Sequence, residues 1–159
     1  MYNAIQEPVE QAEAIKEKSL YETDFYQWAL KTADLLRQGR FTELDIKNIA
    51  EEIEDLGKNN KRELASRLAV LIMHLLKWQY QPEKRSDSWI TTINIQRIDI
   101  ELVLEDSPSL KYDIDKVIEK AFIIAKRKFK KETGLDKNPL PKACPYTWEQ
   151  LNDDDFLPE

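Results

Sequence analysis

The stretch Arg62–Gln81 reads RELASRLAVLIMHLLKWQYQ, and it decides the fold that the rest of the sequence predicts. Apolar residues recur in it at steps of three and four, which is the period of an α-helix. A helix that is apolar on almost every side is a buried helix, so this stretch predicts a central helix with others packed around it. The stripe consists of Leu64, Leu68, Leu71, Leu75 and Trp78, and the other apolar side chains are Val70, Ile72, Met73 and Leu76.

The composition fits one helical domain. The chain has 159 residues, of which 42% are hydrophobic and only three are Gly, so it can bury a core and favours helices over sheets. A net charge of −6 argues against non-specific binding to nucleic acid or a membrane surface. The single cysteine, Cys144, excludes an internal disulfide framework and a cysteine-based zinc site.

No apolar run reaches the length needed to span a membrane, and the N-terminus lacks the pattern of a secretory signal. We therefore expect a cytoplasmic protein. Residues 1–18 are polar and are expected to form a mobile arm, and residues 19–159 are expected to form a single helical domain.

Four main helices are predicted, over about residues 23–38, 45–80, 86–105 and 108–132, which gives an all-α bundle. Capping residues mark their ends: Gly39 and Gly134 follow helices, Asp45 and Ser86 precede them, and Ser107 stands before Pro108 at the first position of the last helix.

Gly57 leaves two alternatives for the second helix. Either one helix runs over about 45–80, with or without a kink at Gly57, or the helix breaks between Gly57 and Asn60. The phase of the apolar stripe continues through Gly57 without a jump, which favours one long helix ending at Pro82.

The third helix carries two apolar faces. One holds Trp89, Ile93, Ile100 and Leu104, and the other holds Ile95, Ile98 and Leu102. Such a helix is either sandwiched within the bundle or shared with a second copy of the protein.

The segment after Leu135 contains four prolines, so it cannot form a continuous helix, although residues 147–152 could form one turn. Its large apolar residues are too many for a free tail, and we expect the segment to pack across the bundle. They are Leu140, Tyr146, Trp148, Leu151 and Phe156.

The main functional candidates are polar residues expected to point inward. On an ideal helix Arg67 and His74 lie about 20° apart, and Glu52 lies near the same edge if the long helix is continuous. Gln96 and Arg97 lie on the Trp89 face of the third helix. A short loop joins the two helices, so they are antiparallel and His74 should face Gln96 or Arg97.

Two interpretations of these five residues stay open. They could form a pocket for acid–base chemistry or an anionic ligand, since a histidine titrates near neutral pH. Alternatively, they form a buried hydrogen-bond network that sets the helix register.

Two other clusters carry side chains that could bind a ligand. Glu51, Glu52, Glu54 and Asp55 lack the Glu-x-x-His pattern of metal-binding bundles, so neither a metal site nor a cofactor is predicted. Aromatic and basic residues around the loop after Tyr80 could bind a base or a peptide, or could cap the end of the bundle.

An ordered string of motifs resembles the family catalogued as domain of unknown function 29, which is mainly cyanobacterial. It comprises YETDFYQWALKTADLLRQGRFTELD, NIAEEIEDLG, HLLKWQYQPEKRSDSW, TINIQR, DSPSL, ETGL and CPYTWEQ. The resemblance implies a small helical protein of bacterial origin and brings no activity, substrate or cofactor.

The spacing from Arg67 to His74 is similar to the short signature of the HEPN helical ribonucleases, in which a dimer brings two such pairs together. Leu68 departs from that signature, which usually has a polar residue after the arginine.

Together these patterns favour a non-enzymatic interaction or regulatory protein that self-associates through the third helix and binds an unknown protein partner. The alternative is a ribonuclease-like or other small hydrolytic enzyme that uses Arg67 and His74.

Overall fold

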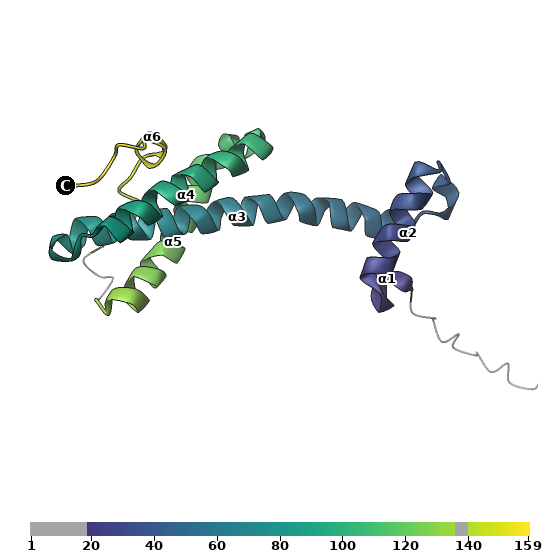
Figure 1. Cartoon of the computed structure of the whole chain (residues 1–159), viewed down its shortest axis with the longest axis horizontal. Helices are drawn as coiled ribbons and strands as arrows, with labels where there is room; N and C mark the ends of the chain where they lie inside the picture. The colour runs from purple at the N-terminus through teal and green to yellow at the C-terminus, as the bar shows by residue number, and fades with distance from the viewer. Residues whose placement is uncertain (1–18, 136–139) are drawn as a thin grey trace, which may run out of the picture. The chain divides into compact units, whose positions relative to one another are not determined.

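The structure is a computed structural model, and it describes residues 19–135 and 140–159. The described chain is all-α, as predicted, and contains no strand (Figure 1). None of its helices is both long enough and apolar enough to cross a membrane. The α-helices are α1 Leu20–Thr23, α2 Phe25–Arg37, α3 Ile46–Tyr80, α4 Asp87–Asp106, α5 Ile114–Thr133 and α6 Trp148–Leu151, and the 3-10 helices are η1 Phe41–Glu43, η2 Pro82–Lys84 and η3 Pro108–Asp113.

The chain divides into two compact units, residues 1–52 and residues 53–159. Helix α3 belongs to both units, because the boundary falls within it. The single domain expected over residues 19–159 stays a prediction, and the arm expected at residues 1–18 lies outside the described residues.

Helix α3 runs without interruption through Gly57, so the alternative of a break between Gly57 and Asn60 is wrong. Asp45 caps its start, as predicted, since the Asp45 carboxylate accepts a hydrogen bond of 3.2 Å from the backbone N–H of Asn48. Continuity follows from the sequence because the cost of one glycine in a helix is about 1 kcal/mol, which the packing downstream outweighs.

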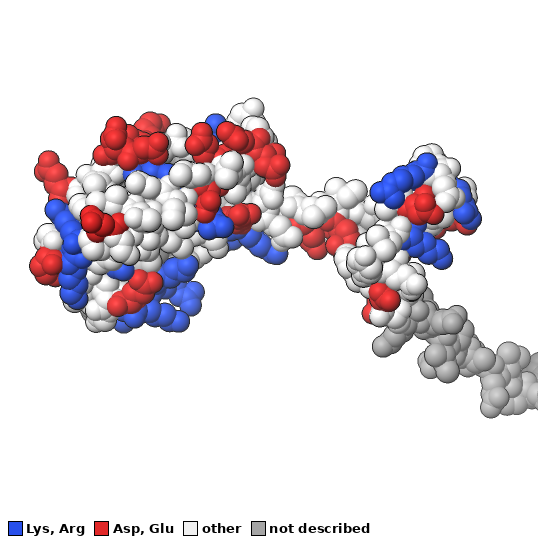
Figure 2. Space-filling model, in the orientation of Figure 1, with Lys and Arg blue, Asp and Glu red and all other residues white. Residues whose placement is uncertain are grey.

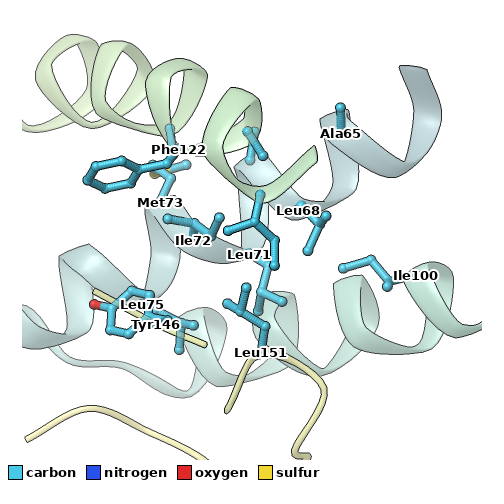
Figure 3. Packing of buried hydrophobic residues seen from close by; sticks show 14 of the residues in the cluster. Ala65, Leu68, Leu71, Ile72, Met73, Leu75, Ile100, Phe122, Tyr146 and Leu151 are labelled. Atoms are coloured by element: carbon cyan, nitrogen blue, oxygen red, sulfur yellow. The ribbon is translucent and has the colours of Figure 1, made fainter. Parts of the chain in front are cut away.

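The core of the second unit is built around the C-terminal half of α3 (Figure 3). Ile72, Met73 and Phe122 meet where α3 packs on α5, while Ile100 reaches the core from α4. Burying each large apolar side chain contributes about 1.5–3 kcal/mol. The side chains of α3 that are buried are Leu64, Ala65, Leu68, Ala69, Leu71, Ile72, Met73, Leu75 and Leu76.

The C-terminal segment packs against this core, as predicted. Leu140, Tyr146 and Leu151 are buried, and Figure 3 shows Tyr146 and Leu151 close to Leu75 of α3. The Tyr146 hydroxyl donates a hydrogen bond of 2.9 Å to Oε1 of Gln79. Thr147 starts the single turn of α6 through a capping box with Gln150, which explains why residues 140–159 form an α-helix at this point.

The four main helices lie where the sequence predicts them, with local differences at the starts of two of them. The first helix, expected over about residues 23–38, is α2, which starts at Phe25 because Asp24 leaves helical geometry and caps α2 with its carboxylate, and the short helix α1 precedes it. The last helix, expected to begin at Pro108, starts with the 3-10 helix η3 and becomes α-helical only at Ile114. Ser107 precedes η3 with Pro108 at its start, as predicted, but its side chain makes no cap hydrogen bond, and its Oγ accepts a hydrogen bond of 2.7 Å from Asn60. The expected glycines do follow their helices, since Gly39 and Gly134 both have φ of 69°.

The first unit has little core of its own. Within its described residues, Leu35 is the only buried hydrophobic side chain. Tyr21, Phe25 and Trp28 form an aromatic cluster with ring centroids 4.8–5.9 Å apart, yet Phe25 stays 51% exposed. Large apolar side chains therefore remain on the surface of this unit.

Helix α3 should become more stable when Gly57 is replaced by alanine. A Cβ atom at Gly57 would meet no described atom within 4 Å, so Gly57→Ala removes backbone entropy from the unfolded chain without a clash. We expect the free energy of local opening, measured by amide hydrogen exchange over residues 53–61, to rise by about 0.5–1 kcal/mol. Gly134→Ala is the opposing control: its positive φ should make the substitution destabilising by about 1 kcal/mol in urea unfolding. Exchange over residues 53–61 that is no slower in Gly57→Ala than in the wild type would contradict the prediction.

Candidate functional site

Arg97 is the best-connected of the predicted site residues. It lies on α4, is only 4% exposed, and points its guanidinium at the backbone of the C-terminal segment. Its Nε donates to the carbonyl of Leu151 at 3.0 Å, and one terminal nitrogen donates to the carbonyl of Phe156 at 2.9 Å. Longer bonds of 3.3 Å reach the carbonyls of Gln150 and Asp154. The planar fork of an arginine suits this task because it offers five N–H donors in a fixed geometry.

The electrostatics of Arg97 follow from its position. Burial lowers the pKa of Arg97, while the carboxylates of Asp154, Asp153 and Asp155 act in the opposite direction. The guanidinium stays charged, because the ordinary pKa of arginine lies far above neutral pH. Arg97 therefore ties α6 and the chain end to α4 with charge-assisted hydrogen bonds.

Gln96 lies beside Arg97 on α4 and is 8% exposed. Its Oε1 is buried and has no hydrogen-bond partner among the described residues. Its position next to the core side chains Ile93 and Ile100 explains the burial.

His74 is half-buried on α3. Its Nδ1 lies 2.9 Å from the carbonyl oxygen of Val70, and because a carbonyl can only accept, Nδ1 carries the proton in this bond. Burial lowers the pKa of His74 below its ordinary value of 6.5, and Lys77 lowers it further, whereas the bond to Val70 and the charge of Glu132 act against this. The ring is therefore neutral at pH 7.

Arg67 points toward α4, and its partner there is Asp99, which was not among the residues expected to form the site. Its guanidinium forms an ion pair of 3.0 Å with Asp99 on α4 and a longer one of 3.6 Å with Glu63. Both groups of the Arg67–Asp99 pair are about one-third exposed, so the pair is worth less than about 1 kcal/mol.

Glu52 belongs to the first unit. Its Oε1 accepts a hydrogen bond of 2.7 Å from the hydroxyl of Tyr21, which joins α1 to the first turns of α3. Among the described residues, no three His, Cys, Asp or Glu side chains are grouped so that they could hold a metal ion.

Among the described residues, the structure thus joins none of the five candidates to another by a hydrogen bond or ion pair. No hydrogen bond or ion pair within residues 19–135 and 140–159 joins His74 to Gln96 or Arg97. The physical reason is that the C-terminal segment occupies the guanidinium of Arg97. The acceptors of the Arg97 hydrogen bonds are backbone carbonyls, which every residue has, so no particular side chain in the sequence indicates them. The catalytic use of Arg67 and His74 stays a prediction.

The aromatic residues near the α3–α4 loop hold cations of the chain itself. Lys77 lies 4.6 Å above the ring of Trp89 and forms an ion pair of 3.0 Å with Glu132. Arg85 lies 4.9 Å from the ring of Trp78 and donates from Nε to the Trp78 carbonyl at 2.8 Å. These contacts connect α3 with α4, α5 and the loop, which fits the expectation that the aromatic residues cap this end of the bundle.

The family model described as domain of unknown function DUF29 matches residues 20–157. The chain belongs to this family. The DUF29 match spans every described helix from α1 to α6, and it confirms the resemblance read from the ordered motifs. Searches of the curated proteins and of the solved structures found no match.

Replacing Arg97 by methionine should release the C-terminal segment. Arg97→Met keeps the length of the side chain but leaves the four carbonyls without their donor, and each lost bond to a charged group is worth about 1–3 kcal/mol in a buried setting. We expect the free energy of unfolding to fall by about 2–4 kcal/mol, with faster proteolysis in residues 140–159. The matched control is Arg127→Met, since Arg127 on α5 is exposed. Equal stability of the two variants would contradict the role of Arg97.

His74 should make stability depend on pH near neutrality. Its pKa in the folded state lies below the ordinary 6.5, so the unfolded chain binds the proton more tightly. The stabilisation is complete above the unfolded pKa and is lost as pH falls through the folded pKa. His74 is the only histidine in the chain. Urea unfolding between about pH 8 and pH 5.5 should therefore show a steeper loss of stability for the wild type than for His74→Gln. Parallel curves would show that His74 has the same pKa in both states.

Proposed function

We propose that the protein is a non-enzymatic interaction protein that self-associates through α4. The observation that carries the proposal is an apolar stripe on the outer face of this helix. Ile95, Ile98 and Leu102 are 49%, 56% and 56% exposed, respectively. The opposite face of α4 buries Ile93, Ile100 and Leu104 in the core, so the helix is apolar on two sides while only one of them is covered.

The spacing of the stripe favours a helix as its partner. Residues at steps of three and four lie on one face, which is the pattern that packs into the grooves of a second helix. An isolated exposed isoleucine is ordinary on a protein surface, but three adjacent large aliphatic side chains form a contiguous patch that marks interaction surfaces.

A second copy of the chain fits this stripe better in the antiparallel than in the parallel direction. Acidic residues crowd the C-terminal half of α4, at Asp99, Glu101, Glu105 and Asp106, while its N-terminal half has only Asp87. An antiparallel pair places each acidic half beside the less charged half of its neighbour, and Ile95 then meets Leu102 of the second copy. A parallel pair would align like charges.

The first unit offers a second apolar surface that favours an interaction protein. Leu30, Ile46 and Phe41 are 55%, 62% and 65% exposed, and Leu35 is the only buried hydrophobic side chain among its described residues. A unit with so small a core gains stability when a partner covers its apolar side chains. The second copy, or a further protein partner, would supply that cover.

A charge on the α4 stripe should prevent self-association. We expect light scattering after gel filtration to give twice the monomer mass of 18.8 kDa for the wild type and the monomer mass for Ile98→Asp. The control is Ile123→Asp on α5, because Ile123 is similarly exposed, at 60%, but lies off the stripe. Circular dichroism should show that both variants keep their helix content.

Two results would contradict the proposal. A wild type that stays monomeric at every concentration tested would exclude self-association. A dimer that persists in Ile98→Asp would place the interface on another surface.

A further inference from the structure

A groove lined by cations lies between α3 and α5 in the second unit. Its volume is about 370 Å³, and it runs between the two helices rather than across one of them. Its floor is apolar, formed by Ala65 of α3 and Val117 of α5. The cations on its walls are Lys58, Lys61 and Arg62 from α3, and Lys116 and Lys120 from α5.

Helical spacing explains how the five cations come together. Lys58, Lys61 and Arg62 are three and four residues apart, so they share one face of α3. Lys116 and Lys120 are four residues apart and share one face of α5. Burial of Ala65 and Val117 draws the two helices together, which sets the two basic faces on opposite sides of the groove.

Most of these cations are not neutralised locally. Lys58 has weak ion pairs with Glu54 at 3.5 Å and Asp55 at 3.6 Å, all of them more than half exposed. The Arg62 guanidinium donates a hydrogen bond of 3.3 Å to the neutral Asn59 side chain and has no ion pair with a carboxylate of the described residues. Lys61, Lys116 and Lys120 have no ion pair with any carboxylate of residues 19–135 and 140–159.

This concentration of positive charge stands against a net charge of −6 for the whole chain. In the view of Figure 2, Lys and Arg gather on the α5 side of the second unit, whereas Asp and Glu gather over α4 and α6. Five cations around one groove repel one another, and an anion placed between them would relieve that repulsion.

We propose that this groove binds a small polyanion that carries at least two phosphate groups. Lysine and arginine on two facing walls can each contact a separate phosphate, and the Ala65–Val117 floor can accept an apolar part of the molecule. The volume lies at the lower end of the range for small-molecule sites, about 300–1,000 Å³. Nucleic acid fits less well, because its extended backbone would also meet the acidic surfaces of the molecule.

Calorimetric titration of the full chain with tripolyphosphate, ATP and inorganic phosphate tests the proposal. At low salt we expect tripolyphosphate and ATP to bind with dissociation constants below about 0.1 mM, and inorganic phosphate to bind at least about tenfold more weakly. Added salt should weaken the binding, since the contacts are charged and partly exposed.

Matched variants separate the groove from the general charge of the protein. Lys61→Gln combined with Lys120→Gln should weaken tripolyphosphate binding by about tenfold. Lys84→Gln combined with Lys131→Gln removes the same charge from exposed sites outside the groove, and should change affinity by less than about twofold. Lys61→Arg combined with Lys120→Arg should keep binding, and circular dichroism confirms that each variant is folded.

Three results would overturn the proposal. The first is an absence of binding by tripolyphosphate and ATP at low salt. The second is an equal loss in the two glutamine pairs, which would show a general effect of charge. The third is tighter binding of a single-stranded RNA 20-mer, with the same sensitivity to the groove variants, which would assign the groove to nucleic acid. The α4 proposal is independent, because Ile98→Asp leaves the groove intact and should bind tripolyphosphate as the wild type does.

Discussion

The second unit depends on keeping water away from the C-terminal half of α3. Nine side chains between Leu64 and Leu76 are buried. They point to so many sides of α3 that two neighbouring helices are too few to bury them all. Helices α4 and α5 cover two sides, and the segment carrying Tyr146 and Leu151 covers more of it. An irregular segment does not form the regular internal hydrogen bonds of a helix. Its buried backbone carbonyls therefore need hydrogen-bond donors from elsewhere in the chain. Arg97 meets that requirement with four backbone carbonyls.

This arrangement assigns different tasks to the two faces of α4. Its inner face supplies core side chains and Arg97, and its outer face leaves Ile95, Ile98 and Leu102 exposed. Helix α3 is divided along its length instead: its later turns form the core, while its turns around Lys58–Arg62 lie on the surface and line the basic groove. The surfaces that we propose for a partner and for a ligand thus lie apart from Gln96 and Arg97, which are buried.

Much of the fold could be predicted from apolar spacing and capping residues. The continuous helix through Gly57, the caps at Asp45 and Ser86, and the helix-ending Gly39 and Gly134 all agree with local rules. The start of α5 could not be predicted in this way, because Pro108 permits both a 3-10 and an α-helical turn and tertiary packing chose the former. The partners of the candidate site residues were harder to predict than the helices. Helical phase gives the side of a helix on which a residue lies, but not the group that its side chain contacts.

The sequence by itself determined the helical class, the family and the buried role of α3, because hydrophobic period and caps act over a few residues and need no knowledge of distant contacts. Only the tertiary structure decided the partners of the polar residues. Arg97 binds carbonyls more than 50 residues away, and Arg67 pairs with Asp99 rather than joining His74 in a pocket. Backbone carbonyls are identical at every residue, so no pattern of side chains predicts which of them Arg97 will bind. The same holds for the basic groove, whose two walls meet only when α3 and α5 pack together.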